Sequence, residues 1–146
     1  MEEEKYQLLK QIHSDSSMAA FNIEVLLKDL KNKDNKIKPY LKDISNKYKE
    51  FENSAKELLD EFDIEAKDPN ILAKLGSSSK IDKEVKCDNS DSAIADMMIE
   101  GVMMGLNKIE KSLKEYDKEL DNKHKKLARD FLNFQNSVIE NLKQYL

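Results

Sequence analysis

The feature that most constrains this fold is an unbroken seam of apolar residues, which runs through residues 36–64 at steps of three and four. Such spacing places the apolar side chains on one face of an α-helix, and lysines and glutamates fill the opposite face. Pro39 is compatible with a helix start, because the first turn does not use its N–H. The seam has the pattern of a helix that packs against other helices, and it consists of Ile37, Tyr40, Leu41, Ile44, Tyr48, Phe51, Ala55, Leu58, Leu59 and Phe62.

Three other stretches have the same periodicity, and they predict helices over residues 2–32, 92–117 and 121–145. The turns after the first and third of the four predicted helices are short and polar, which favours antiparallel neighbours. Three glycines and two prolines in 146 residues leave few helix breakers. We therefore expect a single all-α domain over residues 1–146 that is a bundle of four helices.

Residues 65–91 lose the periodicity and are expected to form one long crossover between the second and third helices. Asp68, Pro69 and Gly76 stand where the N-cap, first position and C-cap of one short helix would lie. The following residues to Asn89 read as an extended loop, which is long enough to return along a helix of about 28 residues. A crossover of this kind is typical of ferritin-like folds. The alternative is a simple up-down-up-down bundle with a loose central loop.

Four segments carry a resemblance to known proteins: Gln11-Ile12-His13, Asp68-Pro69, the apolar stretch 94–105 and the final helix over residues 131–142. In these segments the chain resembles a group of small, uncharacterised bacterial four-helix proteins with a ferritin-like fold. The resemblance covers most of the chain and implies that fold. It implies no activity, because the group carries none that is established.

Charge and cysteine content argue against several classes of protein. The 25 basic and 29 acidic residues are interspersed, so the chain has no focused basic field for nucleic acid. No apolar run approaches the length that spans a membrane, and no signal peptide is expected. The single cysteine, Cys87, suits a reducing compartment and a cytoplasmic protein. It is expected to be an ordinary surface cysteine, and the alternative is a reactive or dimer-linking thiol.

Catalytic and metal-binding patterns are incomplete. A di-iron bundle needs a Glu from each of two helices and Glu-x-x-His from each of the other two. The two histidines, His13 and His124, follow Lys10 and Asp121 at that spacing, and Glu100 points away from the bundle axis. His124 lies among lysines and is expected to be solvated. We therefore expect no enzyme activity, no metal centre and no cofactor.

A thin set of inward polar residues defines a candidate ligand or metal pocket: His13, Ser16, Tyr48 and Gln135. Counting from the helix ends places Gln135 level with Tyr48 and near Gly105, so a Tyr48–Gln135 hydrogen bond would satisfy both groups. One interpretation is a small polar pocket at mid-bundle. The alternative is a polar contact that fixes the register of the helices.

The methionine-rich stretch 95–106 is apolar on two sides of its helix. Met97, Gly101, Met104 and Gly105 lie on the flank or allow close approach of another backbone, so we expect them to be covered by the crossover or by a second subunit. The sequence thus predicts a non-catalytic bundle that acts in protein interaction or structure and that self-associates as a homodimer or binds another protein. The alternative function is metal or small-ligand binding in a degenerate ferritin-like pocket.

Overall fold

A computed structural model describes residues 2–116, 118 and 120–146 of the chain. The described residues form five α-helices and one short 3₁₀ helix: α1 (Glu2–Asp29), α2 (Lys38–Asp60), α3 (Ile71–Cys87), α4 (Asp91–Tyr116), α5 (Asn122–Leu142) and η1 (Lys143–Tyr145). The fold is all-α, and the crossover contributes a full helix beyond the four that the periodicity predicts. Within these residues, no helix combines the length and apolarity needed to cross a membrane.

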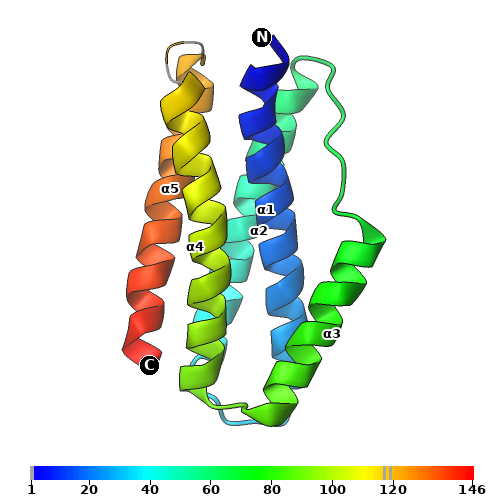
Figure 1. Ribbon diagram of the computed structural model, residues 1–146, viewed down its shortest axis with the longest axis vertical. Helices are drawn as coiled ribbons and strands as arrows, with labels where there is room; N and C mark the ends of the chain where they lie inside the picture. Colours follow the sequence, from blue (N-terminus) through cyan, green and yellow to red (C-terminus); the bar gives the residue numbers. More distant parts are fainter. Residues whose placement is uncertain (1, 117, 119) are drawn as a thin grey trace.

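The helices α1, α2, α4 and α5 stand side by side, and α3 lies outside them (Figure 1). In this view α1 descends and α2 ascends, while α4 runs in the same direction as α2 and α5 in the same direction as α1. Because α2 and α4 are parallel, their connection has to travel back along the bundle. Residues 61–70 cover the first part of that distance as a loop, and α3 covers the rest. The up-down-up-down alternative is therefore wrong for this structure.

The prediction of a short crossover helix that ends at Gly76 is wrong, and so is the extended loop after it. One helix, α3, runs through the Gly76–Ser79 run to Cys87, and it begins after Asn70, whose Oδ1 accepts a 2.8 Å hydrogen bond from the Leu72 N–H. Asp68, the predicted N-cap, lies two residues before Asn70, which is the N-cap in the structure. The extended part of the crossover therefore lies before its helix and not after it.

Packing against α1 explains why α3 stays helical through residues of low helix propensity. Ile81 and Val85 lie one helical turn apart and are each 6% exposed. The Ser77 hydroxyl donates a 2.6 Å hydrogen bond to Asn22 Oδ1 of α1. Tertiary contacts of this kind outweigh the weak local preferences of glycine and serine.

Helix α1 is the central element, because it contacts α2, α3, α4 and α5. Leu8 and Leu9 are both fully buried although they are adjacent in sequence and so point about 100° apart on the helix. Helix α3 forms a second layer outside the bundle beside the C-terminal half of α1, where Ser77 contacts Asn22 (Figure 1). The cavity described below lies at the edge of this second layer.

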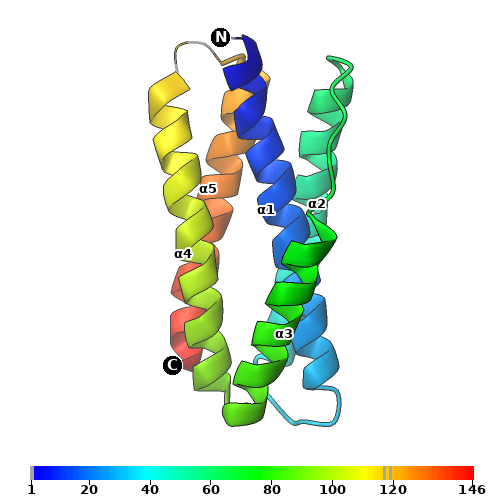
Figure 2. The same cartoon turned by 45° about the vertical axis from the view of Figure 1, so that its right-hand side comes forward.

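The two helix connections at the lower end of the view in Figure 2 are joined to each other. Asn35 Nδ2 donates hydrogen bonds to the Asn89 carbonyl (2.8 Å) and to Asp91 Oδ1 (2.9 Å), and the Lys36 N–H donates to Asp91 Oδ2 (3.2 Å). These bonds tie the α1–α2 loop to the start of α4. They fix the end of α3 close to α4, whereas the beginning of α3 is free to diverge from α4.

His124 is buried, and the prediction that it is solvated is wrong. Its side chain is 1% exposed, and its ring stands edge-on to Phe62 with the centroids 5.6 Å apart. The inward stripe of α5 passes through His124, Ala128, Phe131 and Gln135 at steps of four, three and four. The flanking lysines were the reason for predicting a solvated side chain, but they lie on the other faces of the same helical turn.

Candidate functional site

A cavity of about 470 Å³ lies between α1, α3 and α4 and reaches inward to single side chains of α2 and α5. It exists because α3 meets α4 at one end only and leans away from it toward the other end (Figures 1 and 2). We call it the α3/α4 cavity. Its wall is formed largely by apolar side chains, which are Met18, Ala19, Leu26, Ile81, Met97, Met98, Val102 and Met104.

The inner end of the α3/α4 cavity is polar. Tyr48 of α2 and Gln135 of α5 are 1% and 3% exposed, and the Tyr48 hydroxyl donates a 3.1 Å hydrogen bond to Gln135 Oε1. The predicted hydrogen bond between these two residues is thus confirmed. Burial is the main reason that the pKa of Tyr48 is raised well above its usual range, so its hydroxyl stays protonated and donates this bond.

Asp15 of α1 supplies the third polar group at this end. Its Oδ1 accepts a 2.7 Å hydrogen bond from Gln11 Nε2, one helical turn earlier. Burial raises the pKa of the Asp15 carboxyl to about 6, although the Gln11 hydrogen bond and the charge of Lys108 both act to lower it. Its other oxygen, Oδ2, is buried and has no hydrogen-bond partner among the described residues. The same is true of Gln135 Nε2.

Gly105 of α4 lies beside both of these atoms. A Cβ atom at this position would lie 3.3 Å from Asp15 Oδ2 and 3.9 Å from Gln135 Nε2. An acceptor and a donor that have no hydrogen-bond partner among the described residues therefore lie next to the same glycine. Sequence reasoning assigned Gly105 to close approach of another backbone, and the structure places it beside Asp15 and Gln135.

The four predicted pocket residues are all buried, but they do not form one group. Tyr48 and Gln135 line the cavity together, whereas His13 (4% exposed) and Ser16 (0% exposed) are buried in α1 away from its lining. The Ser16 hydroxyl has no hydrogen-bond partner in the described part of the chain.

Asp15 is the site residue that sequence reasoning missed. One signal was present, because Asp15, Ala19, Asn22 and Leu26 recur at steps of four, three and four. That stripe is separate from the main apolar stripe of α1. It indicates that the helix faces a second layer.

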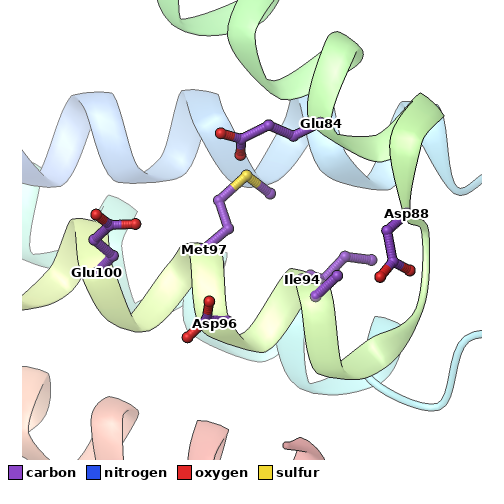
Figure 3. A pocket seen from close by; sticks show the side chains of 7 residues that line it. Glu84, Asp88, Ile94, Asp96, Met97 and Glu100 are labelled. Carbon is purple, nitrogen blue, oxygen red and sulfur yellow. The ribbon is translucent and has the colours of Figure 1, made fainter.

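The predicted second-layer residues divide between covered and open positions. Met97 is partly buried and reaches from α4 toward Glu84 of α3 (Figure 3). Met104 is 63% exposed, and Gly101 is exposed with no atom within 4 Å of its Cβ position. The crossover therefore covers Met97, and it leaves the part of this face around Gly101 and Met104 open beside the cavity.

A smaller hollow of about 230 Å³ adjoins the α3/α4 cavity and shares Glu84, Met97 and Glu100 with it (Figure 3). Asp88 and Asp96 add two further carboxylates to its lining. These acidic groups are not gathered around a common point. In the described part of the chain, no three His, Cys, Asp or Glu side chains are placed to hold a metal ion together.

Cys87 is the last residue of α3, and it is exposed as expected, although it lies on a helix and not in a loop. It is outside the lining of both hollows. Comparison with known proteins finds no matching family model, no similar curated protein and no similar solved structure. The arrangement of side chains around the α3/α4 cavity therefore carries the functional argument.

Proposed function

We propose that this protein is a non-catalytic helical bundle that binds a small organic ligand in the α3/α4 cavity. The observation that carries the proposal is the pair of buried atoms, Asp15 Oδ2 and Gln135 Nε2, which both lie beside Gly105 and have no hydrogen-bond partner among the described residues. A buried polar group without a hydrogen bond costs about 1–3 kcal/mol. A ligand that forms hydrogen bonds with both atoms removes that cost, so its binding is favoured.

The size and lining of the cavity support the same proposal. A volume of about 470 Å³ falls within the range of small-molecule sites, which combine a mostly apolar wall with a few polar groups that fix orientation. Two of the polar groups, Gln135 and Tyr48, are suited to holding a ligand and not to reacting with it. The Gln135 amide does not titrate, and burial keeps the Tyr48 hydroxyl protonated.

The topology supports a ferritin-like arrangement of α1, α2, α4 and α5. The long crossover makes α2 and α4 parallel, as in bundles of that kind (Figure 1). We propose this arrangement together with a pocket that has replaced metal ligands by an amide, a phenol and one carboxylate. Among the described residues, only Asp15 brings a carboxylate to the polar end of the cavity, which favours an organic ligand over a metal ion.

Two glycines provide a matched test of where a ligand binds. Gly101 and Gly76 both lie on helices with open space around the Cβ position, but only Gly101 lines the cavity. We expect Gly101→Phe to block the cavity and Gly76→Phe to leave it open. Isothermal titration with octanamide, octylamine and octanoate then measures binding to both variants and to the unaltered chain.

Binding of at least one of these compounds to the unaltered chain and to Gly76→Phe, with loss in Gly101→Phe, is the expected result. Circular dichroism confirms that each variant is folded. If the unaltered chain binds none of the three, or if Gly101→Phe binds them as well as Gly76→Phe does, the proposed function is wrong.

Self-association is a second candidate function, and exposed apolar residues on α3 and α4 favour it. Ile71, Leu72 and Leu75 of α3 are 74%, 76% and 62% exposed, and Met104 of α4 is 63% exposed. Exposed apolar strips of this kind are commonly covered by another protein surface. We propose a second copy of the chain as the cover.

Sedimentation at several concentrations tests this candidate. A dimer that dissociates in Leu72→Glu, but not in the neighbouring exposed-site control Ala73→Glu, is expected. A monomer at tens of micromolar in the unaltered chain would exclude it.

A further inference from the structure

The two unpartnered atoms at the inner end of the α3/α4 cavity have opposite hydrogen-bonding character. Asp15 Oδ2 is an acceptor and Gln135 Nε2 is a donor, and both lie beside Gly105, where a Cβ atom would approach them to 3.3 and 3.9 Å. A single compact head group placed beside Gly105 therefore reaches both. The head group has to offer one donor and one acceptor on neighbouring atoms.

The orientation of the Gln135 amide is fixed by its surroundings. Its Oε1 accepts the Tyr48 hydroxyl at 3.1 Å, and its Nε2 lies on the side of Gly105 and Asp15. The reverse orientation would bring Oε1 toward the Asp15 carboxylate and place two acceptors together. The donor at this position is thus a consequence of the Asp15 carboxylate, because the Tyr48 hydroxyl can pair with either end of an amide.

Charge excludes two other kinds of head group. Asp15 is largely ionised at neutral pH, since its pKa is about 6, so an anionic head is repelled. A cationic ammonium satisfies Asp15 but presents only N–H groups to Gln135 Nε2, which is itself a donor. A neutral head with an N–H or O–H beside an acceptor oxygen satisfies both atoms.

The remainder of the cavity favours an apolar tail. From the polar end, the wall continues over Met18 and Ala19 of α1, Ile81 of α3, and Met97 and Met104 of α4. Methionine side chains are flexible and adapt to irregular apolar shapes. The open positions at Gly101 and Met104 let the far end of a tail reach solvent.

We infer that the ligand is an uncharged amphiphile, of which a primary amide with an alkyl tail is the simplest form, and that its head group bridges Asp15 Oδ2 and Gln135 Nε2 beside Gly105. This inference rests on the proposed binding function and specifies its ligand class. The amide N–H donates to Asp15, and the amide carbonyl accepts from Gln135. The tail lies on the methionines of α4.

Titration of the full chain at neutral pH with octanamide, octylamine and octanoate tests the inference, because the three compounds share one tail. Octanamide is expected to bind about tenfold or more tightly than either charged compound, since each of them leaves one buried group unsatisfied or repelled. If octylamine or octanoate binds as tightly as octanamide in a manner blocked by Gly101→Phe, the ligand class is wrong and the binding function stands. If none of the three binds, both proposals fail.

Two substitutions test the head-group position itself. Gly105→Ala places a methyl group beside the head group, so octanamide affinity is expected to fall about tenfold or more, whereas the matched Gly76→Ala change outside the cavity leaves it unaltered. Asp15→Asn removes the repelling charge and is expected to reduce the discrimination against octanoate about tenfold while octanamide binding persists. An unaltered octanamide affinity in Gly105→Ala together with an unaltered octanoate affinity in Asp15→Asn would overturn the inference, because it would show that the head group binds elsewhere.

Discussion

The Tyr48 hydroxyl donates a 3.1 Å hydrogen bond to Gln135 Oε1 and so joins α2 to α5 across the core. These residues lie 87 positions apart in the chain. The bond has two consequences: it satisfies a buried phenol, and it holds the Gln135 amide beside Gly105. A contact that joins two helices therefore also positions a polar group of the proposed binding site.

Tyr48→Phe is expected to lower the free energy of unfolding by about 1–2 kcal/mol, because it leaves Gln135 Oε1 buried without this donor. The ring contacts of residue 48 with Phe131 and Phe134 are retained in this variant. Urea denaturation measures the loss. A double-mutant cycle with Gln135→Met isolates the pair, and a coupling energy near zero would contradict the role assigned to the bond.

Asp15→Asn is expected to stabilise the folded chain at neutral pH. Burial raises the pKa of Asp15 from 3.8 to about 6, so the folded state binds more protons than the unfolded state between these values. Stability therefore falls as the pH rises from about 4 to about 6, and the full penalty of roughly 3 kcal/mol persists above that range. The asparagine variant lacks this titration.

Denaturation of the Asp15→Asn variant and the unaltered chain across this pH range measures the effect. The difference between them should be largest near neutral pH and should shrink toward about pH 4, where the Asp15 carboxyl is protonated. A difference that does not vary with pH would show that the substitution acts through packing and not through charge.

Local periodicity was sufficient to predict the parts of this fold that depend on one helix face at a time. The seam of α2 was correct at Leu41, Ile44, Tyr48, Ala55 and Leu59, which are all buried. Counting residues along helices of similar length also placed Tyr48 beside Gln135. These predictions succeed because a single packed face requires one regular spacing.

The rest depends on contacts between distant segments. The Gly76–Ser79 run has the local features of a loop, and only the burial of Ile81 and Val85 against α1 keeps it helical. The lysines around His124 favoured a solvated position, although His124 lies on the inward stripe of α5. Asp15 was missed as a site residue because the neighbouring site residues, Gly105 and Gln135, come from α4 and α5, and no local sequence pattern relates them to Asp15.

Replacement of the three glycines by alanine is expected to change the stability of the fold differently at each position, according to the space around the Cβ atom. Gly76→Ala and Gly101→Ala are each expected to stabilise the fold by about 0.5–1 kcal/mol, because both positions are helical and have open space around the Cβ atom. Gly105→Ala is expected to show no such gain, because its new Cβ meets Asp15 Oδ2 at 3.3 Å.

Thermal denaturation of the three variants measures this order. Destabilisation by Gly76→Ala would contradict a continuous α3, and equal stabilisation by all three substitutions would contradict the close approach of Asp15 to Gly105.

The packing of α3 on α1 is expected to depend on pH, because Asp29 at the end of α1 faces α3. Burial and the neighbouring Asp82 carboxylate of α3 raise the pKa of Asp29 to about 6, so its ionised form opposes the packing of α3 on α1. Because this pKa is higher in the folded chain than the ordinary aspartate value of 3.8, stability from the contact is lost as the pH rises from about 4 to about 6. Asp82→Asn removes one of the two charges and is expected to strengthen the attachment at neutral pH.

Hydrogen-exchange protection of the α3 amides measures the strength of this attachment, and the exposed-site variant Lys83→Gln on the next residue serves as control. Protection in α3 should rise in Asp82→Asn at neutral pH and should differ little from the unaltered chain at about pH 4, where the Asp29 carboxyl is protonated. Equal protection in the unaltered chain and Asp82→Asn at neutral pH would show that these carboxylates do not govern how α3 binds to α1.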